Sequence, residues 1–422
     1  MPKYKYLEKF NNKKIALLGL GLDNQALLEL LKTQKVKAEI TIKDARQDPE
    51  EFNKNLYPFD ILFRSPGWPI LCPGIQEALK KGKTEMTSPL NLFFALCPSK
   101  NIIGVTGTKG KGTTASLIYQ ILKDAGKKVW LGGNIGIAPL GFLNKIKASD
   151  YVILELSSFQ LEDLRFSPMI SVITNLYKEH LAPADPNNPN YHSYYSKYWQ
   201  AKLNIGKNKD NKFLVINSNL KTKIKSVKLP GKLIYFSASQ LNSKLVGTYN
   251  KENIGAALEV AKLLKINIKS AEKSVAKFEN LEHRLELVEE INKIKYYDNS
   301  FSTTPESTIL DLKSFTTPII QIAGGADKGA SFKELAKTIK ANVKFLILLP
   351  GVGTKNIKKE LTKIKFPATK FKEVEDMEEA VKIAEQHAVS GDTVLLSTGC
   401  ASFGIFKNYK ERGDLFKKYV RQ

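Results

Sequence analysis

The chain has 422 residues, of which 42% are hydrophobic and 25% charged, so it can bury several cores, and a long disordered or collagen-like protein is excluded. Lys and Arg number 65 against 42 Asp and Glu, a net charge of +23, and only six of the basic residues are Arg. This excess of Lys is compatible with nucleic-acid binding, with anionic small substrates or with a Lys-biased proteome, and charge alone ranks none of them. At about 150 residues per domain, the length predicts three domains.

Cysteine spacing and hydropathy exclude two further classes of protein. The three cysteines, Cys72, Cys97 and Cys400, are far apart and no C-x-x-C occurs, which argues against a disulfide framework or a thiolate zinc site. No segment approaches ~18 consecutive apolar residues, and the N-terminal segment lacks the pattern of a signal peptide. We therefore expect a cytoplasmic protein without a membrane span.

The first segment has the order strand, glycine turn, helix. The apolar run 14–19 ends in Gly-Leu-Gly, residues 25–31 carry leucines at helical spacing, and further strands are predicted over 38–44 and 61–63. Strands that alternate with helices predict parallel βαβ units.

Two more segments repeat this alternation. In the second, a strand over 101–105 leads into a glycine-rich loop and a helix over 114–124, and a polar stretch over 183–195 is typical of a functional or mobile loop. The other strands predicted there are 129–131, 151–154, 170–174 and 213–216, followed by a helix over 253–264. The third segment has predicted strands 294–297, 318–323, 345–349 and 393–397, with helices over 307–313, 332–339 and 377–387. A third α/β sheet is therefore expected.

The strongest motif lies between the strand 101–105 and the following helix. It consists of Gly107, Thr108, Lys109, Gly110, Lys111, Gly112, Thr113 and Thr114. Backbone N–H groups of such a loop converge on phosphate oxygens, and the N-terminus of the helix adds a favourable dipole. The run departs from G-x-x-x-x-G-K-[ST], because Gly112 stands where the metal-binding hydroxyl is usual, so Thr113 is the expected hydroxyl. The alternative is a Gly- and Lys-rich surface turn.

A weaker motif follows the first strand. Gly19-Leu20-Gly21 resembles the start of the dinucleotide fingerprint, and Asp44 stands about twenty residues later, where that fold has its ribose-binding acid. Asn24 replaces the third glycine, so the motif does not favour NAD. A uridine or another nucleotide at this place, and an unrelated tight turn, both stay open.

Two further residues are candidate metal ligands. Glu155 ends the strand predicted over 151–154, in the unit that holds the glycine-rich loop, and a carboxylate there can hold Mg²⁺. Without that loop, a surface Glu would be the better interpretation. His180 follows the strand 170–174, and the chain has only four histidines. A lone His is more often structural than a ligand, so its position adds modest weight.

Taken in chain order, these motifs resemble the Mur ligase family, the ATP-dependent amide-bond-forming enzymes of peptidoglycan precursor synthesis, and within it the glutamate-adding branch. The resemblance spans nearly the whole chain, and the runs 154–160 and 401–409 are specific to this branch. It rests on residues 19–22, 65–67, 107–114, 133–136, 154–160, 175, 179–180, 198–202, 250, 253, 283–284, 298–305, 324–328, 401–403 and 406–409.

The resemblance implies an α/β fold with three domains. These are an N-terminal Rossmann-like domain over 1–97 that binds the UDP substrate, a central P-loop-type ATPase domain with a mostly parallel sheet over 98–280, and a C-terminal Rossmann-like α/β domain over 281–422 that contacts glutamate and ATP. The implied reaction adds glutamate to UDP-N-acetylmuramoyl-L-alanine through an acyl phosphate, in a cytoplasmic monomer without a nucleic-acid partner. The alternatives are L-glutamate in place of D-glutamate, another Mur or folylpolyglutamate-type ligase, and a basic ATP-dependent nucleic-acid-binding protein.

The resemblance also implies a role for individual residues. ATP is expected on residues 107–114, with further contacts from Asn253, Arg284 and Asn299. Two Mg²⁺ ions are implied, with the ligands Thr113, Glu155, His180 and a carbamylated Lys202. The implied catalytic residues are Lys111, Lys202, His180 and Lys328. The implied substrate contacts are Leu22, Asp23, Asp44, Arg46, Asn134 and Ser157 for the UDP-sugar, and Thr303, Lys328, Ser402, Phe403 and Tyr409 for glutamate.

One run departs from the family pattern. The family usually has N-D-S-K-A-T-N, whereas residues 298–304 read D-N-S-F-S-T-T. Asn299 therefore stands at the position of an Asp that contacts nucleotide, and Phe301 at the position of a Lys that approaches the substrate. Asp298, one position earlier, is the candidate for the acidic role. The loss of a cation leaves the choice between D- and L-glutamate open.

Overall fold

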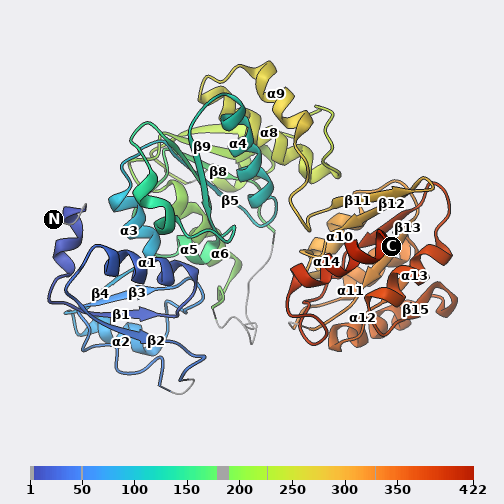
Figure 1. Cartoon of the computed structure of the whole chain (residues 1–422), viewed down its shortest axis with the longest axis horizontal. Coiled ribbons are helices and arrows are strands. Elements are labelled where there is room, and N and C mark those ends of the chain that lie inside the picture. Colours follow the sequence, from blue (N-terminus) through green and yellow to red (C-terminus); the bar gives the residue numbers. More distant parts are fainter. Residues whose placement is uncertain (1–3, 49–50, 178–189, 226, 328) are drawn as a thin grey trace. The chain divides into compact units, whose positions relative to one another are not determined.

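The computed structural model describes residues 4–48, 51–177, 190–225, 227–327 and 329–422. The chain forms two compact units: unit 1 comprises residues 1–239 and 252–275, and unit 2 comprises residues 240–251 and 276–422 (Figure 1). The chain passes from unit 1 to unit 2 at residue 240. It returns to unit 1 within helix α8 (Thr248–Leu263) and enters unit 2 again within helix α9 (Ile268–Lys277).

The N-terminal part of unit 1 contains a parallel four-stranded sheet of order β2-β1-β3-β4. Its strands are β1 (Lys14–Leu18), β2 (Glu39–Lys43), β3 (Ile61–Arg64) and β4 (Glu85–Thr87). Its helices are η1 (Lys5–Phe10), α1 (Leu22–Thr33), α2 (Pro73–Lys80) and α3 (Pro89–Leu96). Residues 15–18 of β1 and all four residues of β3 are buried, as expected for parallel strands that are covered on both faces.

The second sheet of unit 1 has six parallel strands in the order β10-β9-β8-β5-β7-β6. The strands are β5 (Ile102–Thr106), β6 (Val129–Gly133), β7 (Tyr151–Glu155), β8 (Ile170–Ile173), β9 (Phe213–Asn217) and β10 (Lys232–Phe236). The helices are α4 (Lys111–Asp124), η2 (Pro139–Lys145), α5 (Ser158–Leu161), α6 (Tyr195–Leu203), η3 (Asn204–Gly206), η4 (Ser218–Leu220) and α7 (Lys221–Ile224). Because β5 lies between β7 and β8, the loops that follow these three strands meet at one edge of the sheet.

A single hydrophobic cluster joins the two sheets of unit 1. It extends from Leu17 of β1 and Leu27 of α1, through Phe93 of α3, to Leu140 of η2 and Leu154 of β7. Helix α1 packs against both η2 and α3. The first sheet and the central sheet therefore share one continuous core.

Unit 2 contains a six-stranded sheet of order β11-β12-β16-β13-β14-β15, in which only the pair β11–β12 is antiparallel. The strands are β11 (Glu286–Ile291), β12 (Ile294–Asp298), β13 (Ile319–Ala323), β14 (Val343–Leu348), β15 (Phe371–Glu373) and β16 (Thr393–Leu396). The helical elements are α10 (Pro305–Leu312), α11 (Lys333–Asn342), α12 (Val352–Lys363), η5 (Ala368–Lys370), α13 (Met377–His387) and α14 (Tyr409–Val420). Alternate residues of β14 belong to different cores: Ile347 packs in the cluster of α13 and α14, and Leu346 in that of α11 and α12. Helices therefore cover both faces of the sheet.

The predicted fold class is confirmed, because mostly parallel sheets alternate with helices throughout the described chain. Periodicity located the buried central strands to within a few residues but missed β4, β10, β11 and β15, which are edge strands or contain exposed charged residues. The predicted domain boundaries after residues 97 and 280 stay a prediction. Among the helices that the structure describes, none is both long and apolar enough to cross a membrane.

Candidate active site

The glycine-rich loop connects β5 to α4, and two glycines determine its shape. Gly107 has φ +149° and Gly110 has φ +80°, conformations that residues with a side chain rarely adopt. A Cβ at Gly107 would collide with Thr174, and one at Gly110 would collide with Asn253. Helix α4 begins directly after Gly110, so its first N–H groups lie at the loop. This is the arrangement that binds phosphate in other proteins.

Side chains that follow β8 hold this loop in place. The Thr174 hydroxyl donates to Lys109 O at 2.6 Å, and Asn175 Nδ2 donates to the same oxygen at 3.0 Å. Asn175 Oδ1 in turn accepts from the Lys109 N–H at 2.8 Å. Because β8 and β5 are parallel neighbours, their carboxyl ends lie side by side. The loop therefore has a defined shape without a ligand, which reduces the entropy lost when a ligand binds.

Lys111 and the threonines after it begin helix α4. Lys111 Nζ donates to Thr108 O at 3.0 Å, so the ammonium folds back over its own loop. Thr113 is buried, and the Thr114 hydroxyl donates to Asn253 Oδ1 at 3.2 Å. Asn253 of α8, expected as a nucleotide contact, is thus placed beside the first turn of the phosphate-binding helix.

Glu155 ends β7 and is only 2% exposed. Its Oε1 accepts from Asn134 Nδ2 at 2.9 Å, and the Asn134 N–H donates to Glu155 O at 2.8 Å. Gly133, at φ +95°, allows this close approach, since a Cβ there would collide with Glu155 O. Among the residues that the structure describes, no donor reaches the buried Oε2 of Glu155. A buried carboxylate oxygen without a donor is costly. A carboxylate oxygen of this kind fits Mg²⁺, which prefers oxygen ligands.

Lys202 of α6 reaches the same loop from a distant part of the chain. The side chain is 1% exposed, and its Nζ donates to Gly107 O at 2.7 Å. The ammonium also lies 4.7 Å from the centroid of the Tyr198 ring. The Tyr198 hydroxyl forms a 2.8 Å hydrogen bond with the Thr108 hydroxyl, so α6 is attached to the loop at two points.

The turn after β1 explains why Asn24 replaces the third glycine of the dinucleotide motif. Asn24 is fully buried, and its Nδ2 donates to Gly19 O at 2.7 Å. The same amide lies 3.2 Å from Leu18 O and from Phe63 O. The side chain therefore closes the turn and links β1 to β3, which a glycine could not do.

Asp44 is bonded within the same turn. Its Oδ2 accepts from the Leu20 N–H at 2.7 Å and from Arg46 Nη2 at 2.6 Å, and its Oδ1 accepts from Arg46 Nε at 2.8 Å. The carboxylate is buried, whereas the Arg46 side chain is 73% exposed. Asp44 thus closes the turn and orients Arg46, whose outer edge faces solvent.

These bonds predict a pH-dependent contribution of Asp44 to stability. The hydrogen bonds from Arg46 hold the pKa of Asp44 well below its usual range. Since the folded pKa is lower than the unfolded value of about 3.9, the stabilisation is fully present above that value and is lost progressively as the pH falls below it toward the folded pKa. Asp44→Asn is expected to lower the free energy of unfolding at neutral pH, and the difference from wild type should shrink progressively as the pH falls below about 4. Urea unfolding measures both. The exposed Asp124→Asn is the control, and a deficit that does not change with pH would contradict the prediction.

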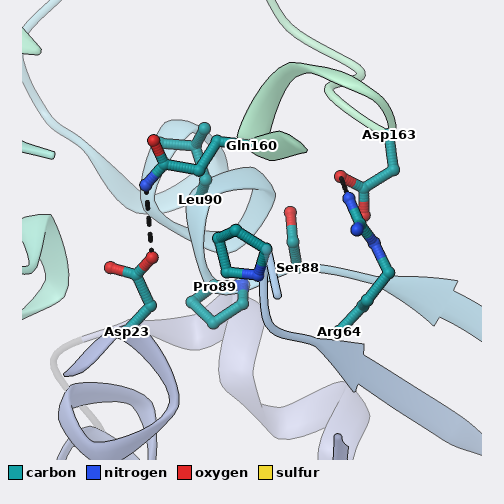
Figure 2. Close-up of a pocket in the computed structure, with 8 residues that line it drawn as sticks. Asp23, Arg64, Ser88, Pro89, Leu90, Gln160 and Asp163 are labelled. Atoms are coloured by element: carbon teal, nitrogen blue, oxygen red, sulfur yellow. Dashed lines mark hydrogen bonds and ion pairs between the residues drawn. The ribbon is translucent and has the colours of Figure 1, made fainter. Parts of the chain in front are cut away.

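A small pocket lies between the first sheet and the segment after β7 (Figure 2). It is lined by Asp23, Arg64, Pro66, Ser88, Pro89, Leu90, Gln160 and Asp163. Gln160 Nε2 donates to Asp23 Oδ2 at 3.3 Å, and Arg64, 1% exposed, pairs with Asp163 at 3.0 Å and with Glu162 at 3.2 Å. Burial raises the pKa of Asp23, against the effect of the hydrogen bond from Gln160. Residues 160–163 therefore fix the first sheet to the central one through buried polar contacts.

The two residues expected to hold the sugar-peptide arm lie at neighbouring strand ends. Asn134 follows β6, and Ser157 follows β7, which is the parallel neighbour of β6. Ser157 begins α5 with a capping box: its hydroxyl accepts from the Gln160 N–H at 3.1 Å, and Gln160 Oε1 accepts from the Ser157 N–H at 3.0 Å.

In unit 2, the run that departs from the family pattern follows β12 and is tightly bonded. Asp298 is fully buried; its Oδ2 lies 2.7 Å from His283 Nδ1, and its Oδ1 accepts from the Ser300 N–H at 2.8 Å. The Asn299 amide donates to Asp311 Oδ2 at 2.7 Å. Both oxygens of Asp298 are therefore engaged within the protein, and its nucleotide-binding role stays a prediction.

The residues expected around glutamate follow the carboxyl ends of β12 and β16. Thr303 comes after β12, and Ser402 (buried) and Phe403 (46% exposed) come after β16. Tyr409 begins α14, and its ring packs edge-on against Phe301 with centroids 5.1 Å apart. On Phe301 also lies the guanidinium of Arg284, 3.7 Å from the ring centroid.

The structure brings one group of expected residues together in unit 1, namely residues 107–114, Asn134, Glu155, Lys202 and Asn253. His180 and Lys328 lie outside the described residues. Sequence reasoning missed Thr174, although its position at the end of a strand beside β5 was a usable signal. It also missed Tyr198, which contacts Thr108, and Asp311, which contacts Asn299. It gave no role to His192, whose buried ring lies 3.0 Å from the Ser158 hydroxyl. Each of these contacts joins residues that the fold brings together, so no local signal in the sequence marks them.

Known proteins resemble this chain along nearly its whole length. Residues 105–242 match the Mur ligase middle domain, and residues 283–400 match the Mur ligase glutamate ligase domain. Proteins named UDP-N-acetylmuramoylalanine--D-glutamate ligase are 35% identical in Acetivibrio thermocellus, over 98% of this chain and 97% of that protein, and 35% identical in Clostridium tetani, over 97% of each.

Among solved structures, MurF ligase from Thermotoga maritima in complex with ADP has a TM-score of 0.61 at 15% identity, over 98% of this chain and 96% of that chain. UDP-N-acetylmuramate-alanine ligase from the same organism has a TM-score of 0.59 at 18% identity, over 97% and 99%. At these identities the solved structures show a common fold.

Proposed function

The chain belongs to the Mur ligase family, and we propose that it joins D-glutamate to UDP-N-acetylmuramoyl-L-alanine with hydrolysis of ATP to ADP and phosphate. The observation that carries this proposal is the phosphate loop with Lys111 folded over it, at the end of a strand that pairs with β7, whose last residue Glu155 is buried and has one carboxylate oxygen that no donor of the described residues reaches. The choice of D-glutamate rests on the names of the relatives that are 35% identical over nearly the whole chain.

The reaction needs activation because a carboxylate is a poor electrophile. In the proposed first step, an oxygen of the substrate carboxylate attacks the γ-phosphorus of ATP, the bond to the β,γ-bridging oxygen breaks, and ADP leaves. In the second step the amine of glutamate attacks the acyl carbon, loses a proton, and phosphate leaves with the C–O bond electrons. Positioning and charge stabilisation are the main tasks of the protein in such a transfer. We assign them to the N–H groups of residues 107–114 and to Lys111, on the ATP phosphates.

Magnesium is the metal that the donor set fits. We propose that Thr113 and Glu155 hold one Mg²⁺ ion, with Asn134 orienting the carboxylate of Glu155 through its bond to Oε1. His180 and Lys202, the latter as a carbamate, are the proposed ligands of a second ion. When bound, such ions offset the negative charge of the phosphates and the substrate carboxylate.

The UDP-sugar is proposed to bind along the first sheet and the ends of β6 and β7. Arg46, oriented by Asp44 and exposed on its outer edge, offers a cation, and Leu22 is exposed at the start of α1. Asp23, in the first turn of α1 and hydrogen-bonded by Gln160, is a further proposed contact on this helix. Further along, Asn134 and Ser157 are the proposed contacts of the sugar-peptide arm.

Glutamate is proposed to contact unit 2 through Thr303, Lys328, Ser402, Phe403 and Tyr409. Arg284 and Asn299 of this unit are the proposed nucleotide contacts, together with Asn253. The cytoplasm, where ATP and UDP-linked precursors are available, is the proposed location.

A coupled assay of ADP release tests the proposed function. The full chain is incubated with ATP, Mg²⁺ and UDP-N-acetylmuramoyl-L-alanine, and D-glutamate, L-glutamate, L-alanine and meso-diaminopimelate are compared separately. We expect sustained ADP release with D-glutamate only, and a product heavier by one glutamyl residue in mass spectrometry. Equal rates with L-glutamate would contradict the stereochemical assignment, and release dependent on another amino acid or on a folate would assign a different ligase. Omission of the amino acid is the control for uncoupled ATP hydrolysis.

A further inference from the structure

We propose that Phe301 is a positioning residue that holds the guanidinium of Arg284 toward an anionic ligand, an inference that rests on the function proposed above. The Cζ atom of Arg284 lies 3.7 Å from the centroid of the Phe301 ring. At this distance the negative face of the ring attracts the cation. Stacking occupies the flat face of a guanidinium, whereas the N–H donors that bind phosphate or carboxylate lie along its edge.

The ring of Phe301 is itself held from two sides. The Tyr409 ring meets it edge-on at 5.1 Å and an interplanar angle of 87°, a favourable arrangement for two aromatic rings. The backbone N–H of Phe301 donates to His283 O at 3.1 Å, which joins it to the residue before Arg284. Phe301 is nevertheless 39% exposed, so burial in a core does not account for this ring.

The backbone around Arg284 is held in an uncommon conformation. His283 has φ +61° and Leu285 has φ +49°, so residues in the left-handed region flank Arg284 on both sides. Two contacts stabilise this turn: the His283 ring lies 2.7 Å from Asp298, and the Asn280 amide donates to Leu285 O at 2.6 Å. Such conformations persist only where the surroundings impose them, and they are frequent at ligand sites.

These contacts give Phe301 a role that its sequence position leaves open. Where the family pattern has a lysine, this chain has an aromatic ring that cannot bind an anion itself. The guanidinium of the neighbouring Arg284 instead stacks on this ring, and Tyr409 packs edge-on against it. A cation is therefore retained near this position by stacking, without a lysine.

Spectroscopy of the arginine side chains tests the stack without any turnover. The chain has only six arginines, so the Nε–Hε NMR spectrum of the full protein is simple, and Arg284→Lys identifies the Arg284 signal. We expect a ring-current shift of this signal in wild type and in Phe301→Tyr, and its loss in Phe301→Leu and Phe301→Met. An Arg284 signal that is the same in wild type and in both aliphatic variants would overturn the stack.

Kinetics test what the stack does. Phe301→Leu is expected to lower kcat/KM for ATP about fivefold, the effect of losing a partly exposed cation–π contact. Phe301→Tyr should restore it to within about twofold, and Phe301→Leu should have no further effect when Arg284 is already Ala, which has no cation to stack. Tyr57→Leu is the matched control, because it removes another exposed cation–π pair, with Lys81 Nζ 3.4 Å from the Tyr57 centroid.

Three results separate the possibilities. If Phe301→Leu and Phe301→Met leave kcat/KM for ATP unchanged, Phe301 does not position Arg284 and the inference is wrong. If Phe301→Leu lowers kcat/KM for ATP equally with and without Arg284, Phe301 acts on the structure in general and not through Arg284, and the inference is also wrong. If wild type shows no ADP release with D-glutamate, the proposed function is wrong. The role of Phe301 is then still tested by the Arg284 NMR signal and by the affinity of the same variants for a non-hydrolysable ATP analogue.

Discussion

Lys202→Ala is expected to abolish ligation, with kcat lower by roughly 10²–10³-fold, the usual loss when a group that stabilises charge in the transition state is removed. Lys202 is 1% exposed, and its Nζ lies 2.7 Å from Gly107 O in the phosphate loop. An ammonium cannot ligate a cation. If the neutral amine adds CO₂ and releases a proton, it becomes a carbamate whose single negative charge is shared by two oxygens, the ligand that we propose. Excess bicarbonate should therefore restore the activity of decarbonated wild type and leave the variant inactive.

The control for Lys202 lies on the same helix. Lys197 of α6 is exposed, and Lys197→Ala should retain the rate of wild type. Incubation with ¹³C-bicarbonate provides a measurement that does not depend on turnover, since a carbamate carbon signal is expected in wild type and in Lys197→Ala but not in Lys202→Ala. Full activity of Lys202→Ala, or an unchanged ¹³C signal, would refute the assignment.

Glu155→Gln is expected to change activity and stability in opposite directions. The substitution removes a proposed Mg²⁺ ligand, and we expect kcat to fall at least about 100-fold, more than the loss of an outer-shell partner causes. In the absence of nucleotide and metal, however, the same change replaces a buried charge whose Oε2 has no donor among the described residues. Neutral groups are less costly to bury, so the free energy of unfolding should rise by about 1 kcal/mol. Urea unfolding and ADP release measure the two effects.

Asp150 provides the matched control for Glu155. It precedes β7, the strand that Glu155 ends, and it is also buried, but its carboxylate is satisfied: Oδ2 accepts from Trp130 Nε1 at 2.8 Å and from the Lys147 N–H at 3.0 Å. Asp150→Asn should therefore reduce stability and leave kcat near that of wild type. A loss of stability in Glu155→Gln would contradict the view that Glu155 is kept for function at a cost in stability.

The phosphate loop was predictable because the residues that form it are contiguous. A buried strand, glycines that can adopt φ above zero, and the start of a helix all lie within residues 101–114, and the structure has them there. Glu155 was predictable for a similar reason, because the carboxyl ends of parallel strands meet at one edge of a sheet. The lack of a donor for Glu155 Oε2 among the described residues was not predictable, since it depends on which donors the fold brings near.

Other features needed the folded chain. Lys202 is one lysine among many in the sequence, and only the packing of α6 against the loop places its Nζ at Gly107 O. Asn24 departs from the dinucleotide motif, but in the fold its amide closes the turn at Gly19 and bonds to Leu18 of β1 and Phe63 of β3. Phe301 looked like the loss of a cation, and the structure instead places Arg284 on its ring.

The sequence by itself determined the alternation of strands and helices, the place of the phosphate loop and the resemblance to the Mur ligase family. These properties depend on periodicity and on glycines close together in the chain, and such short-range patterns survive in the order of the residues. Only the tertiary structure decided how polar groups are paired, which carboxylate oxygen receives no donor from the described residues, and which aromatic ring contacts an arginine. Each of these depends on a contact between segments far apart in the chain, and the geometry of such contacts is set by packing of the cores.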